Sequence, residues 1–331
     1  MNVMVTGGAG YIGSVLSRQL LKQGHTVTVY DNLSRGFRES IAPQARFVQG
    51  DILDRGYLAD VLRAHKIDSV VHMAGLIAVG ESVREPAFYY QQNVTGGLSL
   101  LDAMKDADVT RILFSSTAAV YGEPQRVPIE ETDDKNPTNP YGETKWTFEK
   151  ALRWYGEAFG LHTACLRYFN AAGAADDAGE RHEPETHLIP LILRAALGVS
   201  PAITVFGDDF ATRDGTCVRD YIHVLDLAHA HILALDALAR GEKALVYNLG
   251  CGGDGYTVKE VIDVAKRVTG KDVPVVMGPR RAGDSAVLVA GSEKIKRELG
   301  WKPQHQDLGE IVESAWKFMR TQQFKTSKPG P

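Results

Sequence analysis

A tyrosine and a lysine four residues apart are the side chains of this 331-residue chain best suited to acid–base chemistry. They are Tyr141 and Lys145, in the stretch Asn139-Pro140-Tyr141-Gly142-Glu143-Thr144-Lys145. Residues four apart share one face of a helix, so the Lys145 ammonium can lie near the phenol and lower its pKa from the usual value of about 10. The pair therefore predicts a base that takes a proton from an alcohol near neutral pH. Without a nucleotide-binding fold before it, a half-buried tyrosine beside a surface lysine would be the better interpretation.

Three hydroxyl side chains stand upstream, at the end of a predicted strand, in the stretch Phe114-Ser115-Ser116-Thr117-Ala118-Ala119-Val120-Tyr121-Gly122. In doubly wound sheets, ligands bind beyond the carboxyl ends of the strands. A hydroxyl there can bridge the substrate alcohol and the phenol. Strand ends rich in serine and threonine are common, so only the combination with Tyr141 supports this prediction.

A glycine-rich stretch near the N-terminus predicts a phosphate-binding loop. It stands between a strand-like run over 3–6 and a helical pattern over 12–20, and it matches G-x-G-x-x-G as Gly8-Ala9-Gly10-Tyr11-Ile12-Gly13. Gly7, Gly10 and Gly13 also match a spacing of three. A backbone without side chains can approach a pyrophosphate, whose charge the helix N-terminus favours. Glycines in an ordinary tight turn are the alternative, but the flanking strand and helix favour a dinucleotide site.

Asp31 lies 18 residues after Gly13 and ends the second predicted strand. A carboxylate there accepts hydrogen bonds from an adenosine ribose and repels a 2′-phosphate, which favours NAD over NADP. Asp51 and Ile52 follow the third predicted strand and could flank the adenine. If the glycines were absent, a solvated turn aspartate would be the interpretation of Asp31.

Alternating strands and helices must position these residues. Short apolar and β-branched runs predict strands at 3–6, 26–30, 47–48, 69–73, 111–115, 163–167 and 245–249. Helical patterns fall at 54–65, 87–105 and 221–238, and at the Tyr141 helix, where Asn139 can cap the first turn and Pro140 suits it. This alternation predicts an α/β fold: a doubly wound parallel (Rossmann) sheet with a smaller α/β C-terminal substrate domain.

The strict alternation ends near Asn170, where alanine, glycine and charged residues take over. We therefore expect a NAD-binding domain over 1–170, to which about 221–250 returns. A second domain is expected over 171–220 and 251–320. The last residues, 321–331, are expected to form a mobile tail.

The composition excludes several classes of protein. The 37 basic and 41 acidic side chains give a net charge of −4, which indicates neither a nucleic-acid partner nor an anionic membrane. No apolar run is long enough for a membrane span, and no signal sequence is expected. The three cysteines have no metal or redox spacing and the ten histidines form no ligand cluster, so we expect reduced thiols, no metal site and a cytoplasmic protein.

These motifs resemble the extended short-chain dehydrogenase/reductase superfamily, through Gly7 to Gly13, Ser115 to Gly122 and the Tyr141/Lys145 pair. Within it, the chain resembles the UDP-glucose 4-epimerase family over nearly its whole length. The narrower match rests on further stretches, which are His72-Met73-Ala74-Gly75, Ala78-Val79-Gly80-Glu81-Ser82, Asn93 in a helix, Arg167 to Gly173, Asp214 to His223, and Pro279 to Asp284.

The resemblance implies interconversion of UDP-glucose and UDP-galactose by reversible hydride transfer at sugar carbon 4, through a tightly bound NAD and a 4-keto intermediate. Tyr141 would be the base. Lys145 would hold the nicotinamide ribose and lower the phenol pKa, and Thr117 would bond the sugar 4-hydroxyl. The second domain would bind the UDP-hexose.

The resemblance also assigns binding residues. Those expected at NAD are Gly7, Gly10, Tyr11, Ile12, Gly13, Asp31, Asn32, Asp51, Ile52, Met73, Ala74, Gly75, Asn93, Ser115, Tyr141, Lys145 and Tyr168. Those expected at the UDP-sugar are Thr117, Tyr141, Asn170, His187, Leu188, Thr204, Phe206, Arg219, Arg281, Asp284 and Leu288. Arg219 and Arg281 would clamp the diphosphate, since a guanidinium fork suits paired oxygens.

The chain differs from the pattern of the family that it resembles at a few positions. Thr117 stands where many relatives have serine, and the threonine keeps the hydroxyl. Ile77 replaces a lysine that some relatives use near the cofactor. Leu288 falls where the gate residue of the family is either a large aromatic or something smaller, so UDP-N-acetylhexosamines remain possible substrates. The family also implies a homodimer, although core packing explains the apolar positions of the relevant helices equally well.

Two other functions remain alternatives. A nucleotide-sugar 4,6-dehydratase needs an added acid and base, which such relatives carry directly after the hydroxyl residue. Here those positions are Ala118 and Ala119, which disfavours dehydration. A non-catalytic NAD-responsive binding protein could share the fold, but such proteins often lose the Tyr/Lys pair.

Overall fold

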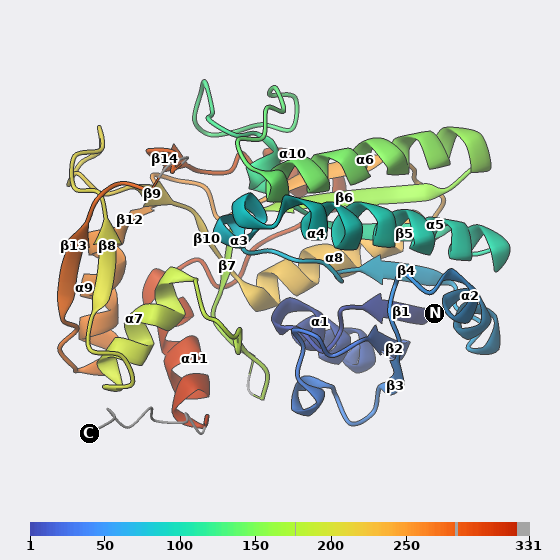
Figure 1. The fold of residues 1–331 in the computed structure, drawn as a ribbon, viewed down its shortest axis with the longest axis horizontal. Helices are drawn as coiled ribbons and strands as arrows, with labels where there is room; N and C mark the ends of the chain where they lie inside the picture. Colours follow the sequence, from blue (N-terminus) through green and yellow to red (C-terminus); the bar gives the residue numbers. More distant parts are fainter. Residues whose placement is uncertain (176, 282–283, 323–331) are drawn as a thin grey trace.

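A seven-stranded sheet lies at the centre of the larger part of the protein (Figure 1). In this computed structural model, which describes residues 1–175, 177–281 and 284–322, the strand order is β11-β6-β5-β4-β1-β2-β3 and each neighbouring pair is parallel. The strands are β1 (Asn2–Thr6), β2 (Thr26–Asp31), β3 (Arg46–Gln49), β4 (Ser69–His72), β5 (Arg111–Thr117), β6 (His162–Tyr168) and β11 (Leu245–Leu249). The predicted doubly wound parallel sheet is confirmed.

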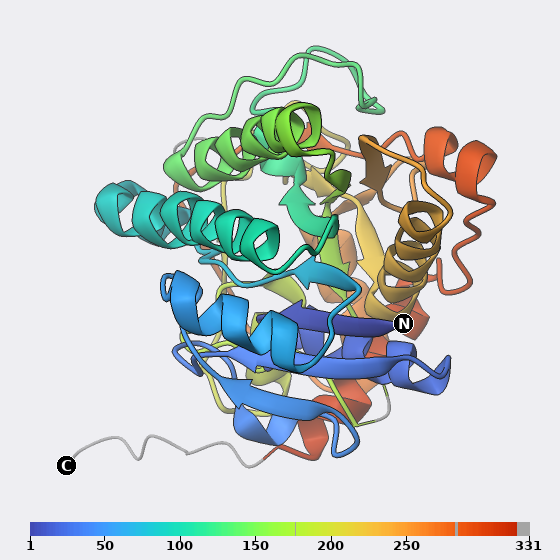
Figure 2. The same cartoon turned by 90° about the vertical axis from the view of Figure 1, so that its right-hand side faces the viewer.

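Helices cover both faces of the sheet (Figure 2). One face is packed by α1 (Tyr11–Lys22), α8 (Val224–Ala239) and α10 (Glu293–Leu299), in a core that contains Val3 and Val5. The other is packed by α2 (Arg55–Ala64), α5 (Gly96–Asp106) and α6 (Pro140–Phe159), in a core that contains Met4. Successive strand residues point to opposite faces, so Met4 lies in a different core from its two neighbours.

The strands are rich in valine because both of their faces are covered. Val3, Val5, Val29 and Val70 are wholly shielded from solvent. Burial of each such side chain contributes roughly 1.5–3 kcal/mol. The strand ends are therefore fixed supports for any side chain or loop that follows them.

The sheet changes its direction of winding at β1, which lies between β2 and β4. At such a point the loops that leave neighbouring strands diverge, and a crevice opens at the carboxyl ends. The glycine-rich loop follows β1, and residues 73–75 follow β4. The predicted cofactor residues are thus placed around this crevice.

A second core lies beside the sheet, among α7 (Leu188–Ala196), α9 (Val258–Thr269) and α11 (Leu308–Arg320). Three small sheets accompany it, built from β7 (Asn170–Ala172) with β10 (Tyr221–His223), β8 (Ile203–Phe206) with β13 (Val275–Gly278), and β9 (Val218–Arg219) with β12 (Tyr256–Thr257) and β14 (Val287–Leu288). Thr257 starts α9 with a capping box that includes Glu260. The smaller α/β part expected from the sequence is present.

Two predicted helices differ from the structure. The helix expected over 221–238 was wrong at its start, because Tyr221–His223 pair with β7 as β10, and the His223 ring then caps α8 by accepting the N–H of Leu225. The helix expected over 87–105 is divided into α4 (Pro86–Tyr89), the π-helical η2 (Tyr90–Thr95) and α5. The remaining short elements are α3 (Val79–Arg84) and the 3₁₀ turns η1 (Arg38–Ser40) and η3 (Ala118–Val120).

Within the described ranges, no helix is long and apolar enough to cross a membrane. Thr321 and Gln322 follow α11, and the rest of the predicted tail lies outside the described residues. Positions 282 and 283 of the stretch that runs from Pro279 to Asp284 also lie outside them.

Candidate functional site

The glycine-rich loop crosses the end of β4 too closely for side chains. Gly7 has a φ of +70°, and a Cβ there would lie 2.5 Å from the backbone nitrogen of Ala74. A Cβ on Gly13 would lie 2.5 Å from the carbonyl oxygen of Gly7. Gly10 caps α1, whose first turn, containing Tyr11 and Ile12, holds no acidic residue. The open amides and the positive end of α1 suit an anion, so these residues fit the pyrophosphate of a dinucleotide.

The acidic residues predicted near an adenosine ribose lie together at the ends of β2 and β3. Asp31 accepts the N–H of Ala9 at 3.0 Å and that of Leu33 at 2.8 Å, and burial raises the pKa of its carboxyl despite these bonds. Asn32 donates to Asp51 at 2.9 Å, and Ile52 is buried beside it. Asp31 therefore ties the second strand to the glycine-rich loop.

Residues at the end of β4 form the other wall of the crevice. The Met73 N–H donates to the Thr6 carbonyl at 3.0 Å, and a Cβ on Gly75 would lie 3.5 Å from the Lys145 Nζ. Asn93, in η2, accepts the N–H of Leu76 at 2.8 Å and donates to its carbonyl at 3.0 Å and to Thr144 at 3.0 Å. In this structure the Asn93 amide thus holds the loop after β4 against α6.

The Tyr141 helix begins as the sequence predicts. Asn139 accepts the N–H of Gly142 at 2.9 Å, and Pro140 occupies the first turn of α6. One turn on, the buried Lys145 donates to the carbonyl of Ser115 at 3.0 Å, and its Nζ lies 6.0 Å from the centroid of the Tyr141 ring. The helix cap and the strand end together set the position of the pair.

The ionisation of the pair differs from the expectation. Burial raises the pKa of Tyr141, although a hydrogen bond with Thr117 lowers it. Burial also lowers the pKa of Lys145 to about 8, against the charge of Glu149, which raises it. The expected lowering of the phenol pKa by Lys145 is wrong for this structure, because the ammonium lies against the Ser115 carbonyl. An additional positive charge beside the phenol would lower its pKa.

A buried ion pair supports the strand ends from behind, and the sequence reasoning missed it. Arg167 and Glu149, whose side chains are 3% and 4% exposed, meet at 2.6 Å. Glu149 also accepts the hydroxyl proton of Ser116 at 2.5 Å, and Arg167 donates to the Tyr121 hydroxyl at 2.9 Å. Glu149 follows Lys145 by four residues on α6, a spacing that could have suggested its orientation. The network fixes the residues on either side of Thr117, and Ser115 is itself hydrogen-bonded to the Tyr168 hydroxyl.

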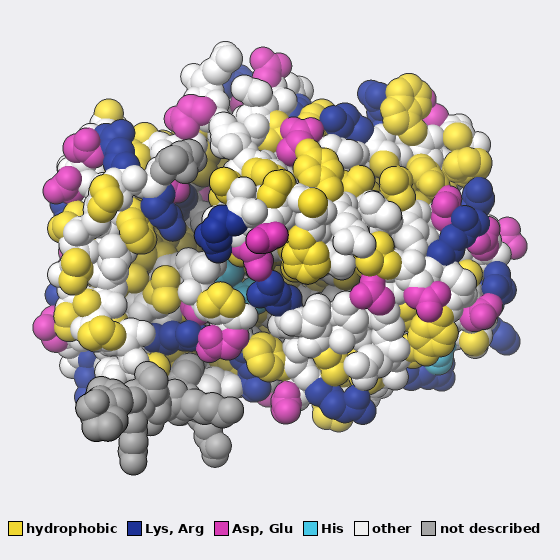
Figure 3. Space-filling view, viewed as in Figure 1, with side chains coloured by type: hydrophobic (Ala, Val, Ile, Leu, Met, Phe, Trp, Pro, Cys, Tyr) yellow, Lys and Arg dark blue, Asp and Glu magenta, His cyan; other side chains and the backbone are white. Residues whose placement is uncertain are grey.

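A second group of predicted residues lies between β8, β9 and β14. Arg281 pairs with Asp284 at 2.9 Å and lies over the Phe206 ring, 4.9 Å from its centroid. Arg219 is 3.9 Å from Asp284 and pairs in register with Leu288 across β9 and β14. Thr204 lies two residues before Phe206 on β8, and both are exposed. The surface is hollowed between the two parts of the molecule, with basic side chains around the hollow (Figure 3).

Asn170 joins this group through the backbone. Its side chain donates to the carbonyl of Asp220 at 3.0 Å. The Asp220 carboxylate accepts the N–H groups of Cys251 at 2.8 Å and of Gly252 and Ala290 at 3.0 Å. Burial raises the pKa of this carboxyl to about 6 despite those bonds. Asp220 therefore joins segments far apart in the sequence, a role that its sequence motif did not reveal.

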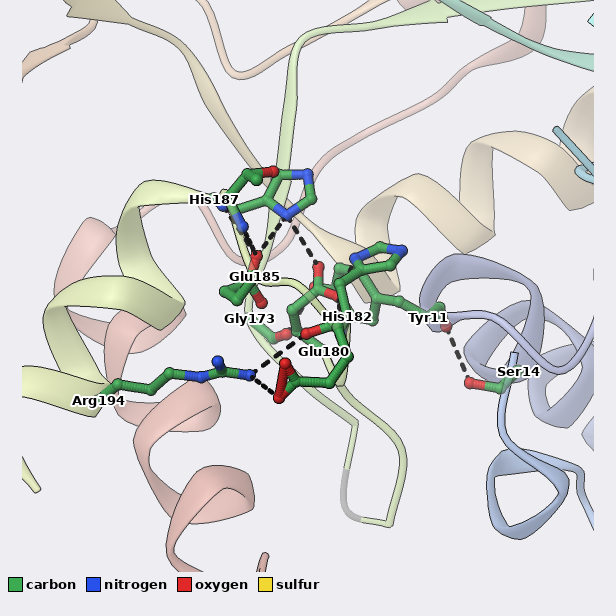
Figure 4. A network of polar contacts seen from close by, with 10 residues as sticks. Tyr11, Ser14, Gly173, Glu180, His182, Glu185, His187 and Arg194 are labelled. Carbon is green, nitrogen blue, oxygen red and sulfur yellow. Dashed lines mark hydrogen bonds and ion pairs between the residues drawn. The ribbon is translucent and has the colours of Figure 1, made fainter. Parts of the chain in front are cut away.

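His187 caps α7, and Leu188 opens it. The His187 ring lies in an unexpected cluster with Glu180, His182 and Glu185 (Figure 4). One ligand atom from each of the four residues lies within 4.8 Å of the others. The expectation that the histidines form no ligand cluster is therefore wrong. Glu-x-His-x-x-Glu-x-His in an irregular segment is not a helical spacing, so only the folded backbone brings the four side chains together.

The arrangement combines three capacities. The crevice at β1 and β4 can hold a dinucleotide, Tyr141 and Thr117 can exchange a proton with an alcohol, and the arginines can hold a second anion. The predicted cofactor and catalytic residues gather at the carboxyl ends of the strands of the large sheet. The predicted UDP-binding residues gather beside the small sheets.

Known proteins resemble the chain over almost its whole length. The model of the NAD dependent epimerase/dehydratase family matches residues 3–250. A UDP-glucose 4-epimerase of Corynebacterium glutamicum is 52% identical, covering 96% of this chain and 95% of the relative. A crystal structure of UDP-glucose 4-epimerase from Brucella ovis with NAD has a TM-score of 0.92 at 45% identity and covers 95% and 97% of the two chains. Another, from Bifidobacterium longum with NAD⁺ and UDP, has a TM-score of 0.92 at 37% identity and covers 97% and 98%.

Proposed function

The chain belongs to the NAD dependent epimerase/dehydratase family, and on this premise we propose that it interconverts UDP-glucose and UDP-galactose as a NAD-dependent 4-epimerase. The observation that carries the proposal is the grouping of Thr117, Tyr141 and Lys145 at the carboxyl end of β5, beside the crevice. Bound NAD supplies the acceptor and donor of hydride for carbon 4 of the sugar. Ala118 and Ala119 offer no acid or base for a competing dehydration.

Tyr141 is the proposed proton acceptor and donor. It takes the proton of the sugar 4-hydroxyl and later returns it, while Thr117, hydrogen-bonded to the phenol, orients that hydroxyl. Lys145 is proposed to hold the nicotinamide ribose. The positive charge of the nicotinamide, rather than the Lys145 ammonium, would then oppose the effect of burial on the phenol pKa.

The proposed cofactor contacts fall into three sets around the crevice. The glycine-rich loop with Tyr11 and Ile12 receives the pyrophosphate, and the residues at the ends of β2 and β3, Asp31, Asn32, Asp51 and Ile52, receive the adenosine. Residues at the ends of β4, β5 and β6, with η2, line the remainder: Met73, Ala74, Gly75, Asn93, Ser115 and Tyr168. We assign 1–170 and 221–250 to the NAD-binding domain, which the position of β11 beside β6 supports.

The substrate is anchored through its UDP group in this proposal. Arg219 and Arg281 hold the diphosphate, and Asp284 orients both guanidinium groups. The other proposed contacts are Asn170, His187, Leu188, Thr204 and Phe206. We assign 171–220 and 251–320 to the nucleotide-sugar-binding domain, although α10 within the second range packs against the large sheet. Firm anchoring at the diphosphate leaves the sugar free to turn, so that hydride can return to the opposite face of the 4-keto sugar.

The size of the sugar pocket is proposed to depend on Leu288. Like Trp146 and Phe169, this side chain packs against the buried cluster of Val120, Tyr121 and Ile129. A leucine leaves more room there than a large aromatic side chain would. Rates measured on UDP-glucose and on UDP-N-acetylglucosamine would show whether an N-acetyl group is admitted.

We also propose that the protein is a cytoplasmic homodimer. Hydrophobic side chains gather over α3, α4 and α6 (Figure 3), and Val83, Phe88 and Trp154 are 62%, 40% and 57% exposed. An exposed apolar face of this kind suits a second copy of the chain. All three cysteines are free thiols, as in reducing compartments. A monomeric mass by light scattering would exclude the dimer.

The decisive experiment is conversion of UDP-galactose by the purified protein without added NAD. We expect UDP-glucose as the product and no net NADH, because the cofactor ends unchanged. A protein that converts neither UDP-hexose, even with added NAD and with retained UDP binding, would refute the proposed reaction.

A further inference from the structure

The cluster of Glu180, His182, Glu185 and His187 takes no part in the proton relay proposed at Tyr141, although His187 is also a proposed contact of the UDP-sugar. All four residues come from one segment of eight residues that leads into α7 (Figure 4). The Glu180 carboxylate lies between the two imidazole rings, whose centroids are 5.2 Å apart. The side chains of Glu185 and Glu180 are 1% and 10% exposed. Buried carboxylates require a positive partner.

Each histidine turns its Nδ1 atom toward a carboxylate. His187 Nδ1 is 2.8 Å from Glu185 Oε1 and 3.8 Å from Glu180 Oε2. His182 Nδ1 abuts the other oxygen of Glu180, is shielded from solvent, and makes no hydrogen bond of normal geometry among the described residues. An imidazole nitrogen and a carboxylate oxygen that face each other need either a proton, which a neutral imidazole with Nδ1–H can supply, or a metal ion between them.

The cluster also borders the proposed binding loop for the cofactor. Glu180 and His182 line a pocket together with Gly10 and Tyr11 of the glycine-rich loop. The Tyr11 hydroxyl donates to the Gly173 carbonyl at 2.6 Å, which ties this loop to the segment before the cluster. Two carboxylates beside an anion-binding loop would repel a diphosphate. A divalent cation at the cluster would remove this conflict.

We propose that Glu180, His182, Glu185 and His187 bind one divalent transition-metal ion of the zinc type. Two imidazole nitrogens and two carboxylate oxygens are ligands that such an ion accepts, and four protein ligands make a closed, structural site. Ligands of a tetrahedral ion with bonds of about 2.0–2.2 Å lie roughly 3.3–3.6 Å apart. The ligand atoms of the four residues lie within 4.8 Å of one another, so small movements of the side chains would bring them to these distances.

Outer contacts already hold several of these ligands. Glu185 Oε1 accepts the N–H groups of Thr186 at 2.7 Å and of His187 at 2.8 Å. Arg194, on α7, donates to the carbonyl of His182 at 3.2 Å and to Glu183 at 3.2 Å. Such contacts orient the ligands of metal sites. The ion would then join the start of α7 to the segment beside the glycine-rich loop and stabilise both.

The test uses tag-free, full-length protein with its bound NAD, stripped with EDTA and titrated with Zn²⁺ alone, without substrate. We expect one tightly bound ion per chain and a higher midpoint of thermal unfolding. An ion that binds only the folded state, at a free concentration 100 times its Kd, shifts the folding equilibrium about 100-fold. Glu180→Gln and His182→Asn should each weaken binding at least about 100-fold. His305→Asn is the matched control, because His305 lies 3.8 Å from Glu310 in a separate, exposed pair, and it should bind like the wild type.

Equal affinity in the wild type and the Glu180→Gln variant would overturn the proposal, as would no binding to the wild type. If the variants do not fold, Co²⁺ binding to the wild type still shows whether the cluster is a metal site. Visible absorption bands of four-coordinate Co²⁺ would support the site, and their absence at millimolar Co²⁺ would assign the cluster to proton-bridged ion pairs. These measurements need no UDP-sugar, so they stand apart from the epimerase assay.

Discussion

The charged side chains at the carboxyl ends of the large sheet are buried, whereas those between β8, β9 and β14 range from the partly buried Arg219 to the exposed Arg281. Lys145, Glu149 and Arg167 are each less than 7% exposed, while the Arg281 side chain is 55% exposed and pairs with a carboxylate three residues away. In the first region, desolvation and fixed partners set the pKa values of charged groups such as Lys145. In the second region, the Arg281 charge is open to solvent and salt. Proton transfer at carbon 4 needs the first kind of environment, and capture of a diphosphate from solution suits the second.

Removing the proposed base would break the first region most directly. We expect Tyr141→Phe to lower kcat by about 10²- to 10⁴-fold while UDP binding is retained, because general-base catalysis contributes about that much. The measurement is the rate of UDP-galactose conversion together with a UDP titration. Tyr155→Phe is the matched control, since that hydroxyl lies on the same helix but bonds to Asp102 at 2.9 Å. Turnover near the wild-type rate in Tyr141→Phe would exclude the phenol as the base.

The buried ion pair behind Thr117 gives the second test. Arg167→Met leaves Glu149 charged and unpaired, so we expect the free energy of unfolding to fall by about 3–5 kcal/mol in urea titrations. Replacing both partners with methionine should cost less, since no unpaired charge remains. Arg153→Met, on the exposed side of α6, should leave the midpoint unchanged. If the single and double variants lost equal stability, pairing would not explain the position of these side chains.

The sequence predicted the parts of the site that depend on local spacing. The glycine-rich turn, the Tyr141/Lys145 pair and the strands with runs of Val follow from neighbouring residues, because periodicity and caps are local properties. Arg167 and Glu149 are 18 residues apart on different elements, so their contact depends on how α6 lies against β6. The Glu180 cluster and the three-residue β10 depend likewise on tertiary packing. The phenol pKa was misjudged because spacing says nothing of burial.

Arg219 and Arg281 give the third test, which separates anchoring of the substrate from the chemical step. Loss of a charged hydrogen-bonding group costs about 1.5–3 kcal/mol, so we expect Arg219→Ala and Arg281→Ala to raise KM for the UDP-hexose roughly 10- to 100-fold with little change in kcat. Added salt should raise the wild-type KM and matter less in the variants. Arg280→Ala is the control, since Arg280 pairs with Asp209 instead. A fall in kcat with an unchanged KM would place these arginines in the chemical step.

The smallest expected effect concerns the pH dependence of stability in the buried region. Burial lowers the pKa of Lys145 from 10.5 to about 8, so between these values the unfolded chain binds more protons at this group than the folded chain does. Its contribution to stability is therefore full above pH 10.5 and is lost as the pH falls through 8. Between pH 7 and pH 9 we expect the free energy of unfolding of the NAD-free wild type, taken relative to Lys145→Met, to rise by about 1 kcal/mol.

Taking the difference between the two proteins cancels the contribution of other groups that titrate in this window. One such group is His187: burial lowers its pKa, but Glu185 and Glu180 raise it to about 9. A difference that stays flat or falls with pH would show that the Lys145 ammonium is not desolvated, and the contrast between the two regions would then rest on geometry alone.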